Sequence, residues 1–449
     1  MSPCAERRVR RLPKDPGAAP WSALLPPPPP PRILQERVTA DWLVIGGGFA
    51  GLAAARRLTQ LRPGDRIALL EATRIGDGPA GRNTGFMIDL PHKLSSEDYA
   101  GAAEADRRET AQNRAAIAFA AEAVEEYGLP EEAFAQSGKI NAAATTAGDR
   151  QNRSYRRHLE ALGEASELLD AAEMKRLTGC DYYLSGLYTP GTAMLQPALF
   201  TRGIAAGLAD KIDLFENSPV TALKRVDGLW RAKTPGGAVT SPKLILAVNG
   251  HAESFGYFAR RLVHIHLYGS MTRALGEDEI RRLGGEPRWG LTPADPMGGT
   301  VRRISGTGGD RIIVRSRVSY TPSLEIDEAR LETMGRAHDK GFRARFPMLA
   351  GVAMAQRWGG RLCLSLNDAP AFGEIEEGVF AACCQNGLGA ARGTLSGMSA
   401  ADLAAQGNAP HVAELLAAEP PSPLPPAPLD RIGATATLAW KEWRAGRER

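Results

Sequence analysis

The chain reads Asp41-Trp-Leu-Val-Ile-Gly46-Gly-Gly48-Phe-Ala-Gly51, then an apolar stretch that fits a helix, then Ile67-Ala-Leu-Leu-Glu71. This order predicts a strand, a glycine turn, a helix over residues 52–61 and a second strand that ends in a carboxylate. The glycines permit a tight turn close to a pyrophosphate, and the helix N-terminus offers free N–H groups and a positive dipole end. Glu71 lies 25 residues after Gly46, near the spacing of an acid that binds ribose hydroxyls. The segment therefore predicts a βαβ unit that binds an adenine dinucleotide, with a purely structural glycine turn as the alternative.

The composition is that of an ordinary globular protein. Its 449 residues, 43% hydrophobic and 24% charged, allow two or three domains. The net charge of +4 is small for this length, so no nucleic-acid partner is expected. We find no apolar stretch of the roughly 20 residues that span a bilayer, and no apolar core of an export signal behind the basic N-terminus. The five cysteines, two of them adjacent, form no disulfide pattern, which favours a cytoplasmic location.

The pattern along the chain predicts an arm, two interleaved domains and a tail. Residues 1–36 are basic and then proline-rich, which predicts an extended arm whose Trp21, Leu24 and Leu25 can dock on the body. Residues 37–95, 185–256 and 353–405 predict the nucleotide domain, with strands at 212–215, 220–223 and 244–248 and helices at 191–207 and 394–403. Residues 96–184 and 257–352 predict a substrate domain, with helices at 100–127 and 155–177, a strand near 139–146 and an antiparallel sheet that includes 312–318. Residues 406–449 predict a linker and a C-terminal helix.

Two further segments indicate which kind of dinucleotide cofactor the chain binds. Cys384-Gln-Asn-Gly387-Leu-Gly389 leads into a predicted helix, whose N-terminus can stabilise negative charge on an electron-accepting ring such as a flavin. A plain glycine turn before a helix is the alternative. The segment from Arg74 to Phe86 is rich in small residues that let the backbone pass close to a bulky cofactor, while Arg82 and Asn83 can hold a pyrophosphate or a ring edge.

Together with Leu246-Ala-Val-Asn249-Gly250 and Trp358-Gly-Gly-Arg361, these motifs occur in the order of a known family. The chain resembles the D-amino-acid-oxidase-like FAD-dependent oxidoreductases, and Gly81-Arg-Asn-Thr-Gly85 with the Trp358 motif resembles most the gamma-glutamylputrescine oxidase branch. The resemblance covers about residues 21–402. It implies an α/β fold in which a doubly wound, glutathione-reductase-like FAD-binding domain is interleaved with a mixed antiparallel α+β substrate domain.

The resemblance also implies the cofactor contacts. The glycine turn would line the pyrophosphate, Glu71 the ribose, Val220 the adenine, residues 81–87 the isoalloxazine and residues 387–389 its pyrimidine end. Some relatives attach the flavin through a cysteine where this chain has Arg361, two residues before Cys363, so noncovalent FAD is expected. The expected cofactor contacts are Gly46, Gly48, Phe49, Ala50, Gly51, Glu71, Ala72, Arg74, Gly81, Arg82, Asn83, Thr84, Gly85, Phe86, Met87, Val220, Asn249, Gly250, Trp358, Gly387, Leu388 and Gly389.

The activity that the resemblance implies is oxidation of the C–N bond of a small amine or amino acid, with a secondary or N-substituted substrate favoured. Hydride transfer to flavin N5 would give an imine that water hydrolyses, so the cofactor carries the chemistry and no catalytic side chain is assigned. The electron acceptor is oxygen or another molecule. The alternatives are a dehydrogenase with a quinone or protein acceptor, a flavin-binding subunit of a heteromeric amine dehydrogenase, and an NAD-binding dehydrogenase. The oligomeric state stays open.

Substrate contacts are predicted from residue type and position. Asp89 suits a cationic amine or a hydroxyl, and a surface loop is its alternative. Arg315 and Arg317 should point to the same face of a strand, where a guanidinium grips an anion bidentately; a solvated face is the alternative. His264 and His266 have no third ligand nearby, so no metal site is expected. The substrate candidates are Asp89, His92, Tyr268, Arg302, Arg303, Arg315, Arg317, Tyr320 and Arg361.

Overall fold

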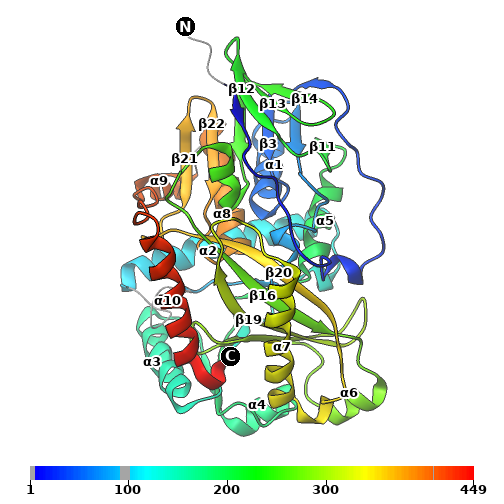
Figure 1. The fold of residues 1–449 in the computed structure, drawn as a ribbon, viewed down its shortest axis with the longest axis vertical. Helices are drawn as coiled ribbons and strands as arrows, with labels where there is room; N and C mark the ends of the chain where they lie inside the picture. Colours follow the sequence, from blue (N-terminus) through cyan, green and yellow to red (C-terminus); the bar gives the residue numbers. More distant parts are fainter. Residues whose placement is uncertain (1–5, 92–101, 408) are drawn as a thin grey trace.

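The computed structural model describes residues 6–91, 102–407 and 409–449, which form two large sheets and two small ones (Figure 1). The glycine turn belongs to a six-stranded sheet in which five neighbouring strands run parallel and β21 pairs antiparallel with β22 at the edge. Its strands, in spatial order, are β11 (Asp213–Phe215), β4 (Ile67–Leu70), β3 (Trp42–Ile45), β15 (Lys243–Leu246), β22 (Val379–Cys383) and β21 (Ala371–Glu376). This is the doubly wound order, in which the chain leaves β3 toward one side and returns at β15 on the other.

Both faces of this sheet are covered. Side chains alternate along β3, so Trp42 and Val44 face a layer of helices while Leu43 and Ile45 face a second sheet. The helices of that layer are α1 (Phe49–Leu61), α2 (Ala103–Glu126), α5 (Pro197–Gly207) and α8 (Gly389–Ala404). The covering sheet consists of β1 (Arg7–Arg8), β12 (Ala222–Val226), β13 (Leu229–Lys233), β14 (Ala238–Ser241) and β2 (Arg37–Thr39).

The second large sheet has eight strands and lies below the first in Figure 1. Its strands, in spatial order, are β20 (Met354–Leu364), β16 (Val263–Thr272), β19 (Arg311–Tyr320), β18 (Thr300–Ile304), β17 (Trp289–Pro293), β7 (Lys139–Ala143), β9 (Ser185–Thr189) and β8 (Glu167–Leu169). Two helices, α7 (Glu328–Arg345) and α10 (Leu429–Ala445), pack against it (Figure 1). The remaining helices are α3 (Thr146–Leu162), α4 (Ala171–Thr178), α6 (Glu277–Leu283) and α9 (Pro410–Ala417).

A three-stranded sheet forms between the two large ones. It joins β5 (Phe86–Met87), β10 (Ala193–Leu195) and β6 (Phe134–Ala135). Since β5 belongs to the segment expected beside the flavin, this small sheet ties that segment to the body. None of the helices formed by the residues described above is long and apolar enough to cross a membrane.

The structure differs from the sequence-based expectations at several points. Strands β9 and β20 were expected in the nucleotide domain, yet both pair within the eight-stranded sheet. Helix α2 was expected in the substrate domain, but its apolar side packs in the nucleotide core against α8. The helix predicted over 155–177 is α3, β8 and α4, because Gly163 ends α3 in a left-handed conformation and Asp170 caps α4. The strand predicted over 220–223 starts at Ala222 and belongs to the five-stranded sheet.

Candidate cofactor and substrate site

A large cavity lies at the carboxyl ends of β3 and β15, where the strand order reverses. In doubly wound sheets ligands bind at this point. The cavity extends from the glycine turn after β3 to the eight-stranded sheet, so its walls come from both large sheets. Of the 22 expected cofactor contacts, 17 line it, which places the motifs singled out from the sequence around one space.

The glycine turn owes its shape to close backbone packing. Gly46 has a φ of +104°, and a Cβ there would lie 2.5 Å from the carbonyl oxygen of Ala247. A Cβ on Gly51 would lie 1.7 Å from the carbonyl oxygen of Gly46. Helix α1 then begins after Gly48 with no side chain as its N-cap, so its first N–H groups face the cavity without a protein partner of that kind. This arrangement suits an anionic ligand group such as a pyrophosphate.

Glu71 stands at the end of β4 and lines the cavity. Its carboxylate accepts hydrogen bonds from the backbone N–H groups of Gly47 and Thr73 at 2.8 and 2.9 Å, and from the Thr73 hydroxyl at 3.1 Å. Burial raises the pKa of Glu71, and these hydrogen bonds counteract the rise. The side chain is therefore held in one orientation beside the glycine turn.

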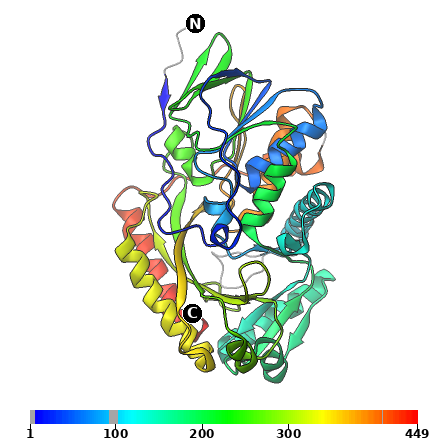
Figure 2. The same ribbon diagram turned by 90° about the vertical axis from the view of Figure 1, so that its right-hand side faces the viewer.

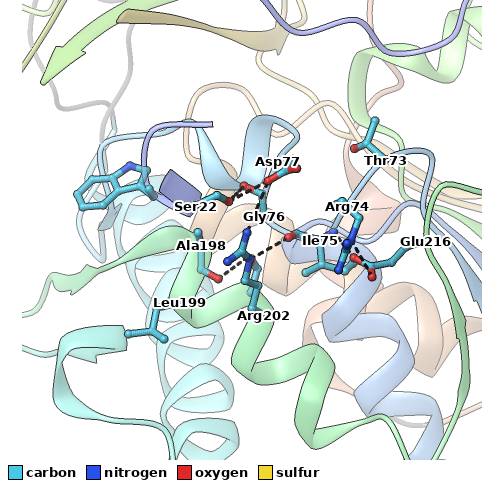
Figure 3. A network of polar contacts seen from close by, with 12 residues as sticks. Ser22, Thr73, Arg74, Ile75, Gly76, Asp77, Ala198, Leu199, Arg202 and Glu216 are labelled. Carbon is cyan, nitrogen blue, oxygen red and sulfur yellow. Dashed lines mark hydrogen bonds and ion pairs between the residues drawn. The ribbon is translucent and has the colours of Figure 1, made fainter. Parts of the chain in front are cut away.

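Beyond Glu71 the loop is fastened by a polar network (Figure 3). Arg74 pairs with Glu216 at 3.1 Å, and the Glu216 carboxylate also accepts from the Ile75 N–H at 2.7 Å. The Ser22 hydroxyl donates to Asp77 at 2.9 Å and to the carbonyl of Gly76 at 3.1 Å. The guanidinium of Arg74 is thus committed to a carboxylate, although the residue lines the cavity.

Arg82 and Asn83 line the cavity and are held in place by hydrogen bonds to the backbone. Arg82 donates to the carbonyls of Pro16 and Gly17 at 2.9 and 3.0 Å, and to that of Asp77 at 2.7 Å. The Asn83 amide donates to the Ala80 carbonyl and accepts from the Gly85 N–H. Both residues therefore shape the loop, and their contact with a pyrophosphate or ring edge stays a prediction.

A second helix end points at the cavity. Gly387, Leu388 and Gly389 line it, and α8 begins there without a side-chain N-cap. Helix α8 packs closely on α1, because a Cβ on Gly397 would lie 2.0 Å from the carbonyl oxygen of Ala50. The cavity therefore receives two uncapped helix N-termini, each with a positive dipole end.

Five expected cofactor contacts lie outside the cavity lining. Gly51, Gly81, Gly85 and Gly250 are positions where a Cβ would meet other protein atoms, so they permit close chain packing. Met87 is fully buried in the helical core. These residues support the walls without forming their surface.

The N-terminal arm covers the cavity. Val9, Arg11, Leu12, Pro13 and Asp15 line it together with the glycine turn. Asp15 forms an ion pair with Arg361 at 2.8 Å, in which both side chains are less than a tenth exposed. The candidate Arg361 therefore faces the cavity but is already paired. The sequence predicts only an extended arm that can dock on the body. Its proline-rich composition does not indicate which part of the body it contacts.

Of the four candidate arginines in the substrate lobe, one lines the cavity: Arg315. Arg302 is buried and donates to the carbonyls of Thr84 and Leu195, and Arg303 forms a buried two-pronged pair with Asp310. The expectation that Arg315 and Arg317 share a face is wrong. The pairing of β16 and β19 shifts register at this point, Arg317 adopts a φ of +69°, and its side chain reaches Glu442 of α10 at 3.5 Å.

The other substrate candidates lie away from the cavity lining. Asp89 is buried, pairs with Arg114 at 3.1 Å and accepts from the Thr192 hydroxyl at 3.3 Å. Tyr268 is fully buried, and the Tyr320 hydroxyl donates to Asp430. His92 lies outside the described residues. The strand histidines are buried, with His264 bonded to Glu253 and His266 to Thr321.

The sequence did not predict that His251, Thr292 and Thr300 line the cavity. His251 follows the Asn249-Gly250 motif, lines the cavity and has a neutral ring at neutral pH, because burial and then the charge of Arg361 lower its pKa to about 3. Thr292 and Thr300 come from neighbouring strands and line the cavity near Arg315. A threonine in a strand is ordinary, so only strand pairing reveals such residues.

A known protein family, two curated proteins and a solved structure are similar to this chain over most of its length. Residues 41–403 match the FAD dependent oxidoreductase (DAO) family. The chain is 27% identical over 383 residues to the probable oxidoreductase OrdL of Rhizobium meliloti 1021, covering 82% of this chain and 83% of that protein. It is 26% identical over 383 residues to the gamma-glutamylputrescine oxidoreductase of Escherichia coli K12, covering 82% and 84%. A glycine oxidase from Geobacillus kaustophilus, 18% identical, shares the fold with a TM-score of 0.66 over 83% of this chain and 96% of its own.

These findings confirm the resemblance predicted from the motifs, including the α/β fold. The residues present fit the cofactor: two uncapped helix N-termini suit its anionic groups, and Glu71 beside the glycine turn suits a ribose. Since the family match spans most of the sequence, the chain belongs to the FAD-dependent oxidoreductases of the D-amino-acid-oxidase family, with FAD as its cofactor.

Proposed function

We propose that this enzyme oxidises the C–N bond of a small amino acid, N-substituted or primary, whose carboxylate is bound by Arg315 in the cavity. 

The observation that carries the proposal is that Arg315 lines the same cavity as the glycine turn and both helix N-termini. Two of the three proteins named above are an oxidase of glycine and an oxidoreductase of gamma-glutamylputrescine, which supports an amine or amino acid as the substrate.

Bound FAD would supply the redox chemistry, a two-electron oxidation of the C–N bond to an imine that water hydrolyses. The protein's own residues would bind and orient the cofactor. The N-termini of α1 and α8 would receive its anionic groups, Glu71 would bind the ribose, and the backbone near Val220 would border the adenine.

FAD is held without a covalent bond in this proposal. The position that carries the flavin-linking cysteine in some relatives is Arg361, and Cys363 lies on the same strand, buried and outside the cavity lining. We expect acid precipitation to leave the yellow colour in the supernatant. Colour that stays with the precipitate would overturn the noncovalent assignment.

Arg315 and Arg317 provide a matched test of the anion site. We expect Arg315→Met to lower the specificity constant for an amino-acid substrate by roughly 30- to 1000-fold, since a desolvated arginine–carboxylate contact contributes about 2–4 kcal/mol. Arg317→Met should stay within a few-fold, because Arg317 pairs with Glu442 on α10. The measurement is the rate of anaerobic flavin reduction across concentrations of D-amino acids, N-methyl amino acids and secondary amines.

A parent enzyme that reduces its flavin with uncharged secondary amines as fast as with amino acids would contradict the anion site. So would an Arg315→Met variant that matches Arg317→Met. The flavin content of each variant, read from its absorbance, separates a loss of substrate binding from a loss of cofactor.

A further inference from the structure

Four polar residues form a row across neighbouring strands of the eight-stranded sheet. Asn141 pairs with Thr292 between β7 and β17, and Thr300 pairs with Arg315 between β18 and β19. Leu291 pairs with Val301, which brings Thr292 next to Thr300. Since cross-strand partners share a face, all four side chains project from the same side of the sheet.

The apolar residues next to the row show that the row faces the cavity. Leu291, Val301 and Val314 pack in the core cluster that includes Phe342 of α7, on the opposite face. Thr292, Thr300 and Arg315 line the cavity. The row is therefore a continuous strip of polar side chains along the cavity wall, with Asn141 at its inner end.

Hydrogen bonds at the inner end decide what Thr292 can offer. Lys139, two residues before Asn141 on β7, donates to the Asn141 side-chain oxygen at 2.5 Å. An ammonium group only donates, so this bond fixes the orientation of the Asn141 amide. The Thr292 hydroxyl donates to the same oxygen at 2.6 Å. The single hydroxyl proton of Thr292 is therefore donated to Asn141, and Thr292 presents a hydrogen-bond acceptor to the cavity.

The next residue in the row is unpaired. The Thr300 hydroxyl is buried and has no hydrogen-bond partner among the described residues, although Thr300 lines the cavity. A buried hydroxyl without a partner costs free energy, which a bound ligand would recover. The outer end of the row is the Arg315 guanidinium, which offers only donors.

We propose that this row selects the substrate side chain: with the carboxylate on Arg315, Thr292 accepts a hydrogen bond from a neutral donor such as a carboxamide or a hydroxyl. The inference rests on the function proposed above and specifies its substrate class. Adjacent strands lie about 4.8 Å apart, so the backbones at Arg315 and Thr292 are separated by roughly 10 Å, and the donor lies several bonds from the carboxylate.

Charge and hydrogen bonding disfavour the two competing kinds of side chain. The Lys139 ammonium donates to the Thr292 hydroxyl oxygen at 3.4 Å, which leaves that oxygen one further lone pair, and it repels a ligand ammonium group at that position. A carboxylate would meet the acceptor side of Thr292, since the hydroxyl proton is bound by Asn141. Burial lowers the pKa of Lys139 to about 8, and nearby Asp89 opposes that shift, so the ammonium form prevails at pH 7.

The experiment uses the FAD-loaded enzyme at pH 7 and four amino acids of equal chain length, ending in a carboxamide, a carboxylate, an ammonium or a methyl group, in both enantiomers. The readout is the concentration dependence of anaerobic flavin reduction. We expect the specificity constant for the carboxamide to exceed each of the other three at least 10-fold. Thr292→Val should abolish the preference over the methyl substrate.

Lys139 acts through Thr292 as a positioning residue, so its variant has a different signature. Lys139→Met removes the charge and lets the Asn141 amide turn, which releases the Thr292 proton toward the cavity. We expect the ratio of carboxylate to carboxamide specificity to rise at least 10-fold, a change that a merely structural role would not produce. Thr201→Val serves as the control, because Thr201 is a buried threonine of α5 outside the cavity lining.

The outcomes separate the two proposals. Flavin reduction by amino acids without a preference for the carboxamide would overturn this inference and leave the proposed function standing. A preference that survives Thr292→Val would also overturn it. Reduction by none of the four amino acids would overturn both.

Discussion

At the scale of single residues, Gly48 shows how a cofactor position differs from a packing position. A Cβ on Gly51 would collide with the carbonyl of Gly46, whereas a Cβ on Gly48 would find its nearest neighbour, the Ala80 side chain, at 3.5 Å. The backbone at Gly48 has a negative φ, so a larger residue fits the fold locally. A larger side chain at position 48 would fill part of the cavity beside the first turn of α1.

We therefore expect Gly48→Val to lose FAD without a matching loss of the apo-protein's stability. The valine occupies space where the pyrophosphate approaches the backbone. Loss of a ligand present at about 1,000 times its Kd removes roughly 4 kcal/mol of apparent stability. The measurements are the flavin-to-protein absorbance ratio and thermal unfolding with and without added FAD.

Gly351→Val is the matched control, since Gly351 is exposed and a Cβ there meets nothing within 4 Å. It should keep its flavin. Full FAD occupancy in Gly48→Val would show that the phosphate turn lies elsewhere.

Residue types predicted the charge of the substrate lobe but not which arginine lines the cavity. Arg302, Arg303, Arg315 and Arg317 look alike in sequence. The difference lies in distant partners: the carbonyls of Thr84 and Leu195 for Arg302, and helix α10 for Arg317. Motif residues near one another in sequence were easier, because the glycine turn and Glu71 follow from local spacing alone.

At the scale of elements, the predictable features were those with a strong period. The strand, turn, helix and strand around Gly46 and the helix into which Gly389 leads follow from apolar spacing and glycine placement. The bulge in β19 does not, because it arises from pairing with β16 and leaves no mark in the local sequence. One extra residue there redirected Arg317 to the opposite side.

A buried histidine of helix α7 binds to the eight-stranded sheet, which predicts that the folded state becomes less stable in acid. His338 bonds to Ser270 of β16 and to the Ser316 carbonyl of β19, and burial lowers its pKa to about 4. The folded state thus holds the neutral ring while the unfolded chain binds a proton below about pH 6.5. The resulting stability is present above that pH and is lost as the pH falls toward 4.

At pH 5 this single histidine should lower the free energy of unfolding by about 2 kcal/mol relative to neutral pH. We expect His338→Gln to reduce the difference in stability between pH 7.5 and pH 5 by that amount. Urea unfolding at the two pH values measures it. An unchanged difference would place the acid sensitivity in other groups.

At the scale of the whole molecule, the arm completes a cavity that the two large sheets leave open. Besides Asp15 and Arg361, it is held by Trp21, which is fully buried and donates to the Asn83 carbonyl at 2.7 Å, and by the short strand β1 on β12. Figure 2 shows the arm descending along the body before it returns to the upper sheet. Composition predicted an extended segment; its location depends on partners more than 60 positions away.

We expect Asp15→Asn to speed the release of FAD at least 10-fold. The variant leaves Arg361 buried without its counter-charge, and breaking a buried ion pair costs about 3–5 kcal/mol. Lys14→Gln is the control, since the Lys14 side chain is largely exposed and pairs with Glu325 at the surface. The rise of flavin fluorescence after dilution gives the release rate, and equal rates in both variants would show that the arm does not retain the cofactor.

The reach of the arm sets an order in time. Asp15 and Arg361 are separated by 346 positions, so Asp15 leaves the ribosome long before its partner exists. At about 5–20 residues per second, synthesis of the intervening chain takes roughly 20–70 seconds. During that interval the βαβ unit around Gly46 has already emerged, while the arm cannot yet form its ion pair with Arg361. The glycine turn is thus made long before the arm is fastened at Asp15, and that closure belongs to the last part of synthesis.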